Sequence, residues 1–107
     1  MASGRLGAVD LVATTNTLAY TVPASTVASV NVSISNRNAL AVVIRLAHLN
    51  GGIGTLANED YIEYDVTIAA NGTLERTGIV MAATHTIVAY SDTANVSVQV
   101  WGWEETA

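Results

Sequence analysis

The feature that most constrains this chain is a run in which apolar and polar residues alternate over residues 28–35. Apolar side chains occupy the even positions and small polar side chains the odd ones: Ala28, Val30, Val32 and Ile34, against Ser29, Asn31, Ser33 and Ser35. Successive side chains of a β-strand point to opposite faces, so this pattern gathers the apolar groups on one side. We therefore predict a half-buried strand over residues 26–35.

The same signature recurs in short runs rich in Val, Ile and Thr, residue types that fit a pleated strand. Asn, Gly and Pro separate the runs and favour turns. The predicted strands cover residues 8–14, 18–22, 26–35, 40–49, 60–68, 74–81, 85–91 and 96–103. No segment needs to be a helix, and no linker divides the chain. We expect one all-β domain over residues 1–107, an antiparallel two-sheet β-sandwich that is jelly-roll-like with about eight strands.

Two of these strands indicate their surroundings. The strand at 40–49 is apolar on both faces, as in a strand that is central or covered on its second face. Arg45 interrupts that second face. In the strand at 60–68, continuous alternation predicts an inward and an outward set: Ile62, Tyr64, Val66 and Ile68 toward the core, and Tyr61, Glu63 and Asp65 away from it.

The turns are predicted from residues that tolerate a left-handed backbone. Asn36-Arg37-Asn38 predicts a turn after the strand at 26–35. Asn71-Gly72 predicts a two-residue type I′ hairpin joining the strands at 60–68 and 74–81, because both residues accept positive φ. Three glycines predict a long loop over residues 50–58.

The composition restricts the classes of partner. Hydrophobic residues make up 50% of the chain but charged residues only 12%, against about 25% in a typical soluble domain. Either a partner covers part of the surface, or the surface is neutral and Thr-rich. The net charge is −5 and the four basic residues, all Arg, are scattered, which argues against nucleic acid. No run approaches the ~20 apolar residues of a membrane helix, so we expect no membrane partner.

No motif in the sequence predicts catalysis. His48 and His85 lack a recognisable nucleophile or triad context. The acidic cluster Glu59, Asp60, Glu63 and Asp65 fits a solvated or Arg-paired face better than a cation site or a catalytic carboxylate pair. The chain has no Cys, and its Gly-rich loop lacks the Lys of a nucleotide loop. We expect a protein that is not an enzyme and has no cofactor or metal.

Three large side chains lie, by strand parity, on faces opposite the core: Arg45, Trp101 and Trp103. Two indoles on one strand face fit a protein interface, packing against another segment of the chain, or a sugar platform. We hypothesise that these faces contact neighbouring subunits and that Arg45 pairs with Glu63, Asp65 or a partner's carboxylate. The candidate interface residues are Arg45, Glu63, Asp65, Trp101 and Trp103.

Several segments together resemble small virion proteins of tailed phages. They are Thr21-Val22-Pro23-Ala24, Ser35-Asn36-Arg37, the segments at 60–65 and 74–79, Val96-Ser97-Val98 and the segment at 102–105. Proteins of this kind and size are similar to capsid decoration, or cement, proteins, which are often β-sandwich or jelly-roll trimers seated where capsomers meet.

The resemblance implies a structural virion protein that decorates the capsid surface. Its partners would be copies of itself, with a trimer favoured, and the major capsid protein or another virion protein. It supplies no catalytic residue. The alternative is a host-receptor or carbohydrate-binding module of a phage tail or fibre.

Overall fold

The computed structural model describes residues 2–107. Within them the chain forms eight strands: β1 (Ser3–Asp10), β2 (Thr17–Thr21), β3 (Thr26–Asn36), β4 (Val42–Leu49), β5 (Tyr61–Ile68), β6 (Thr73–Met81), β7 (Thr86–Ser91) and β8 (Val96–Thr106). Two single-turn 3-10 helices, η1 (Ile53–Thr55) and η2 (Asn58–Asp60), lie between β4 and β5. The predicted boundaries agree to within three residues, except for the first strand, which was predicted too late in the chain.

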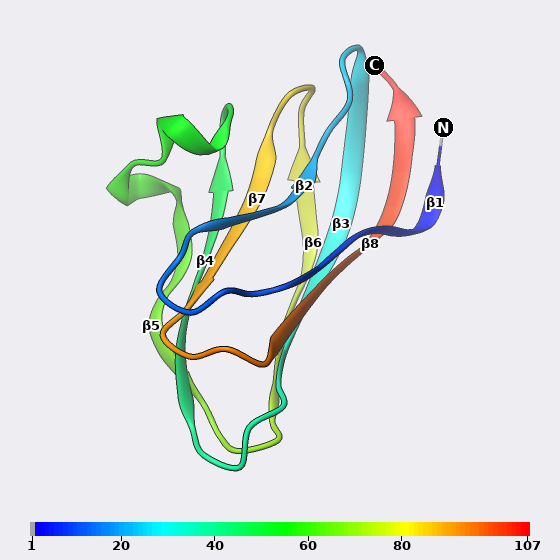
Figure 1. Cartoon of the computed structure of the whole chain (residues 1–107). Coiled ribbons are helices and arrows are strands. Elements are labelled where there is room, and N and C mark those ends of the chain that lie inside the picture. Colours follow the sequence, from blue (N-terminus) through cyan, green and yellow to red (C-terminus); the bar gives the residue numbers. More distant parts are fainter. Residues whose placement is uncertain (1) are drawn as a thin grey trace.

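The strands form two four-stranded antiparallel sheets that face each other (Figure 1). Sheet A has the order β1-β8-β3-β6, and sheet B has the order β2-β7-β4-β5. Consecutive strands alternate between the two sheets, except for β4 and β5, which are neighbours in sheet B. This is the eight-stranded arrangement of a jelly roll, so the predicted two-sheet β-sandwich is confirmed.

The core fills the space between the inner faces of the two sheets. The alternation in β3 is reproduced in its burial, since Val30, Val32 and Ile34 are buried and the residues between them are half-exposed. Ile44 of β4 and Ile87 of β7 meet them from sheet B. Burying a side chain of this size stabilises the fold by about 1.5–3 kcal/mol relative to leaving it in water.

The predicted facing of β5 is wrong in its first half. Its pairing with β4 is irregular at two places, because Ile44 pairs with Val66 and Leu46 with Glu63, but Ala47 with Tyr61. Asp65 has a φ of 53°, as expected where an extra residue enters the strand. The bulges turn Glu63 inward and leave Ile62 and Tyr64 exposed, whereas Ile68 lies in the core as predicted.

The second apolar face of β4 is covered by the chain itself. Ala47 and Leu49 join Val88 of β7 in a small cluster on the outer face of sheet B. Leu56 and Tyr61, from the end of the β4–β5 connection and the start of β5, pack over this cluster. The prediction of a central or covered strand is confirmed, and no partner is needed to cover this part of the sheet.

The turn at Asn71-Gly72 differs from the predicted hairpin. It connects β5 of sheet B to β6 of sheet A, so its flanking strands do not pair with each other. Asn71 has a φ of 57°, but Gly72 does not have positive φ, and its N–H donates to the Ala69 carbonyl at 2.9 Å. Positive φ at the third position alone is the pattern of a type II turn, so the type I′ prediction is wrong.

Asn36 ties together two loops at one end of the sandwich. Its side chain is buried, and its amide nitrogen lies 2.9 Å from the Leu40 carbonyl, 3.2 Å from that of Ile68 and 3.1 Å from that of Ala69. Its amide oxygen accepts the Asn38 N–H at 2.9 Å. The predicted turn therefore depends on side-chain hydrogen bonds and not on a left-handed backbone at Asn36.

Asn36→Ala is expected to lower the free energy of unfolding by about 2–3 kcal/mol, because it leaves buried carbonyl groups without donors. Chemical denaturation followed by circular dichroism measures the loss. Asn50→Ala, at an exposed position, is the matched control and should change stability by less than about 0.5 kcal/mol. A variant at position 36 as stable as this control would contradict the role assigned to Asn36.

Candidate interaction surfaces

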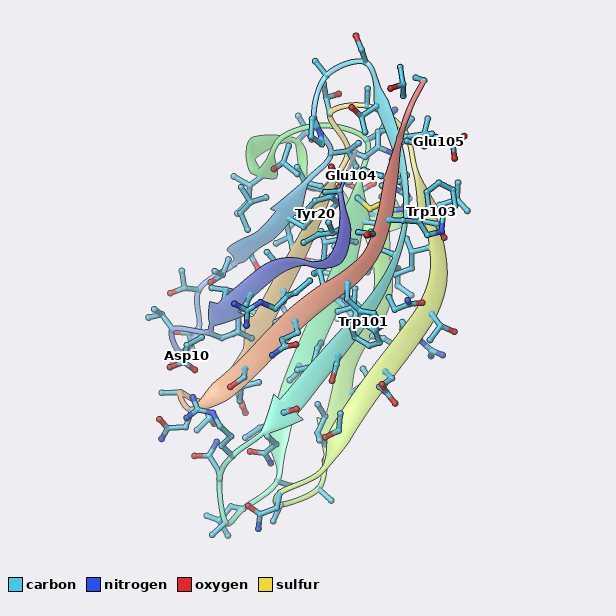
Figure 2. The ribbon with its side chains drawn as sticks, turned by 90° about the vertical axis from the view of Figure 1, so that its right-hand side faces the viewer. Asp10, Tyr20, Trp101, Trp103, Glu104 and Glu105 are labelled. Atoms are coloured by element: carbon cyan, nitrogen blue, oxygen red, sulfur yellow. The ribbon has the colours of Figure 1, made fainter. Side chains whose placement is uncertain are left out.

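The outer face of sheet A carries both tryptophans. Trp101 pairs with Asn31 of β3, and Trp103 pairs with Ser29. Figure 2 looks toward this sheet and shows the two side chains on β8. Trp103 is 47% exposed and Trp101 is half-buried. The prediction that both face away from the core is confirmed.

On the β3 side the surroundings of the tryptophans are uncharged, whereas on the β1 side the exposed Arg5 pairs with Trp101. Outward positions of β3 and β8 next to them hold small polar side chains: Ser29, Asn31, Ser33, Ser97 and Gln99. Val80 of β6, which pairs with Ser29, is 74% exposed. We call Ser29, Asn31, Val80, Trp101 and Trp103 the Trp face. Charged residues lie around it, on β1 and β6 and at Glu105 near the end of β8.

Gly102 maintains the backbone that carries the two indoles. Its φ is 151°, and a Cβ atom there would lie 2.1 Å from the Ser29 carbonyl oxygen. Any side chain would therefore push β8 away from β3. The glycine allows the two central strands to stay paired between the positions of Trp101 and Trp103.

Arg45 lies on the outer face of sheet B, where it is enclosed by residues of the same chain. Its Nε donates to the Asp65 carboxylate at 2.6 Å. Its guanidinium carbon lies 4.4 Å from the centre of the Tyr64 ring and 4.7 Å from that of Tyr90. The hydrogen bond to Asp65 raises the pKa of Arg45. The bulge in β5 places both Tyr64 and Asp65 opposite Arg45.

The predicted pairing of Arg45 with a carboxylate is confirmed for Asp65. Because the partner is in the same chain, the pairing gives no argument for a neighbouring subunit at this position. Glu63, the other intrachain candidate, faces the core and forms an ion pair with Arg76 of β6. That pair connects the two sheets at the edge where β5 and β6 lie.

A second polar contact connects the sheets on the other side of the molecule. The Tyr20 hydroxyl of β2 donates to the Glu104 carboxylate of β8 at 2.5 Å, and Figure 2 labels both residues. Burial and this carboxylate raise the pKa of Tyr20 well above its ordinary value. The hydroxyl therefore remains a hydrogen-bond donor.

The two histidines, which are 37 positions apart, meet at one end of the sandwich. His48 Nε2 lies 2.9 Å from His85 Nδ1, so one ring donates a hydrogen bond to the other. His85 Nδ1 also lies 3.4 Å from the Ala82 backbone nitrogen. Sequence reasoning missed this contact, since nothing local to either residue indicates that β4 ends beside the start of β7.

Metal-ligating side chains do not gather into a candidate site within residues 2–107. No three His, Asp or Glu side chains of this part of the chain could hold a metal ion together. Nor does any of its helices have the length and apolar character needed to cross a membrane. Comparisons with protein-family models, with curated proteins and with solved structures give no match.

The His48–His85 contact predicts a loss of stability in mild acid. Burial and the neighbouring His85 lower the pKa of His48, against an opposing effect of Asp60. In the unfolded chain the His48 ring binds a proton with a pKa near 6.5, whereas in the folded chain it binds the proton only at lower pH. Stability is therefore fully present above about pH 6.5 and is lost as the pH falls toward the lower pKa of the folded state.

Urea unfolding from about pH 7.5 to 5.5 should show this decline, with a slope of at most about 1.4 kcal/mol per pH unit for one proton. His48→Gln removes the titrating ring and should flatten the curve over this range. If the wild type and this variant declined with equal slopes, the histidine contact would not be the cause.

Proposed function

We propose that this protein is a non-enzymatic structural component of a tailed-phage particle, and most specifically a decoration protein that binds and stabilises the capsid shell. The observation that carries the proposal is the Trp face. It presents two indoles and an exposed valine on an ordered sheet, with small uncharged side chains of β3 on one side and Arg5 of the edge strand β1 beside Trp101. The resemblance of the sequence to small virion proteins is the reason for proposing a phage particle as the place where this face is used.

The chemistry of this face suits docking against another protein. Trp is enriched at the energetic centres of interfaces, where its large apolar area is removed from water. Burying an unpaired charge is costly; the β3 side chains beside the indoles carry none, and Arg5 lies on the edge strand β1, where it can stay in the solvated rim. The charged residues around it resemble the polar rim that surrounds the core of a typical interface.

A protein that binds the assembled shell, and not its separate subunits, shifts the equilibrium toward assembly by mass action. A modest affinity per site is sufficient, because linked copies add their binding through multivalency. We therefore propose a homo-oligomer, with a trimer favoured, whose partner is the major capsid protein or another virion protein.

The alternative, a host-receptor or carbohydrate-binding module of a tail or fibre, places the same fold elsewhere in the particle. It needs few copies, whereas a shell coat repeats with the capsid lattice. Copy number therefore separates the two proposals without knowledge of the partner.

Quantitative mass spectrometry of purified particles is expected to find this chain at on the order of hundreds of copies, in a fixed ratio to the major capsid protein. The major tail protein, counted in the same sample, is the internal reference. A count of only a few copies per particle would favour the tail or fibre module, and absence from particles would contradict both proposals.

A further inference from the structure

The outer face of sheet B has a recess at the start of β5 that is distinct from the Trp face. It is lined by Asn58 of η2 and by Tyr61 and Tyr64 of β5, and its volume is about 460 Å³. Sites for small molecules commonly have volumes of about 300–1,000 Å³ and combine aromatic walls with a few polar groups. The recess therefore has the size and lining of a ligand site.

The two tyrosine rings are held in place before any ligand arrives. They meet nearly edge to face, with centroids 4.8 Å apart and an interplanar angle of 77°. Tyr61 packs on the apolar cluster of Ala47, Leu49 and Val88. Tyr64 is 55% exposed, yet Arg45 stacks on its ring at 4.4 Å and is fixed by Asp65. A preorganised site loses less conformational entropy on binding.

The charges around the recess favour a neutral ligand. Glu59, beside Asn58, is exposed, and the adjacent Asp60 adds a second carboxylate, so an anion would be repelled. A cation on the Tyr64 ring would add a second positive charge beside the guanidinium of Arg45, which lies 4.4 Å from the ring centre. Arg45 is itself neutralised by Asp65.

We propose that this recess binds a neutral glycan, with a pyranose ring stacked on Tyr64 and its hydroxyl groups hydrogen-bonded to Asn58 and the tyrosine hydroxyls. A sugar ring has an apolar C–H face that packs against an aromatic ring, and a rim of hydroxyl groups that matches an amide and phenols. The site lies on the opposite sheet from the Trp face. The inference is therefore independent of the proposed capsid role.

The test is a titration of the isotope-labelled full chain, followed by amide chemical shifts. The probes are maltose, cellobiose, lactose and N,N′-diacetylchitobiose, each up to about 20 mM, because a shallow site of this kind binds in the millimolar range. At least one probe is expected to shift the signals of Asn58, Tyr61 and Tyr64 in a saturable way.

Three variants distinguish stacking in the recess from other modes of binding. Tyr64→Ala should weaken binding of that sugar at least about tenfold, whereas Tyr64→Phe keeps the ring and should stay within about threefold. Trp103→Ala removes an aromatic side chain of similar exposure from the other sheet and should leave the affinity for the sugar unchanged.

Either of two results would overturn the proposal. One is the absence of saturable shifts at these three residues with all four sugars. The other is a Tyr64→Ala variant that binds as tightly as the wild type. Hydroxyl-radical labelling of Tyr64 then tests the other use of the recess. If none of the sugars binds and this labelling decreases when the chain assembles, the recess is a protein contact instead.

Discussion

The constraint on which the structure depends is that each sheet must bury one face against the other. The apolar row of β3 shares one core cluster with Ile44 and Ile87 of sheet B, and all of these side chains are buried. Because every strand uses its inward positions for this core, the outward positions are free to differ. One outer face carries two tryptophans beside small polar side chains of β3, with charged residues around them. The other carries tyrosines, an ion pair and the covering loop between β4 and β5.

Polar groups at the margins of the core fix how the sheets close on each other. Glu63 and Arg76 connect β5 to β6, and Tyr20 and Glu104 connect β2 to β8. Among the described residues, no buried side-chain nitrogen or oxygen lacks a hydrogen-bond partner. These contacts make the geometry of the sandwich specific, since apolar packing alone does not select one relative position of the sheets.

The sequence was sufficient for the fold class, because alternation in β3 and β8 assigns both the strands and the facing of Trp101 and Trp103. It was insufficient where pairing decides the conformation. The bulges of β5 arise from its register with β4. They turn Glu63 toward the core and Tyr64 toward solvent, the reverse of the predicted facing. β1 has few apolar residues in an alternating pattern, and it forms a strand because its backbone pairs with that of β8. Asn71-Gly72 has the local signature of a hairpin but connects two different sheets.

For the candidate site, the alternation of side chains along the strands was sufficient to predict the Trp face and a carboxylate partner for Arg45. It did not predict the tyrosine recess or the histidine contact. Both depend on the β4–β5 connection or on strands distant in the sequence. The loop that covers β4 also reduces the amount of surface that must be covered by a partner. The proposed assembly therefore uses the Trp face of sheet A.

The chain contains two tryptophans, and both lie on the outer face of sheet A, so tryptophan fluorescence reports on this face alone. The most direct measurement is iodide quenching of that fluorescence in the dilute protein and in its assembled form, with size measured in parallel by sedimentation. The account predicts that assembly shifts the emission to shorter wavelength and lowers the quenching constant at least about twofold, as water is removed from the indoles. An assembled form whose tryptophans remain as accessible to iodide as in the dilute protein would contradict it.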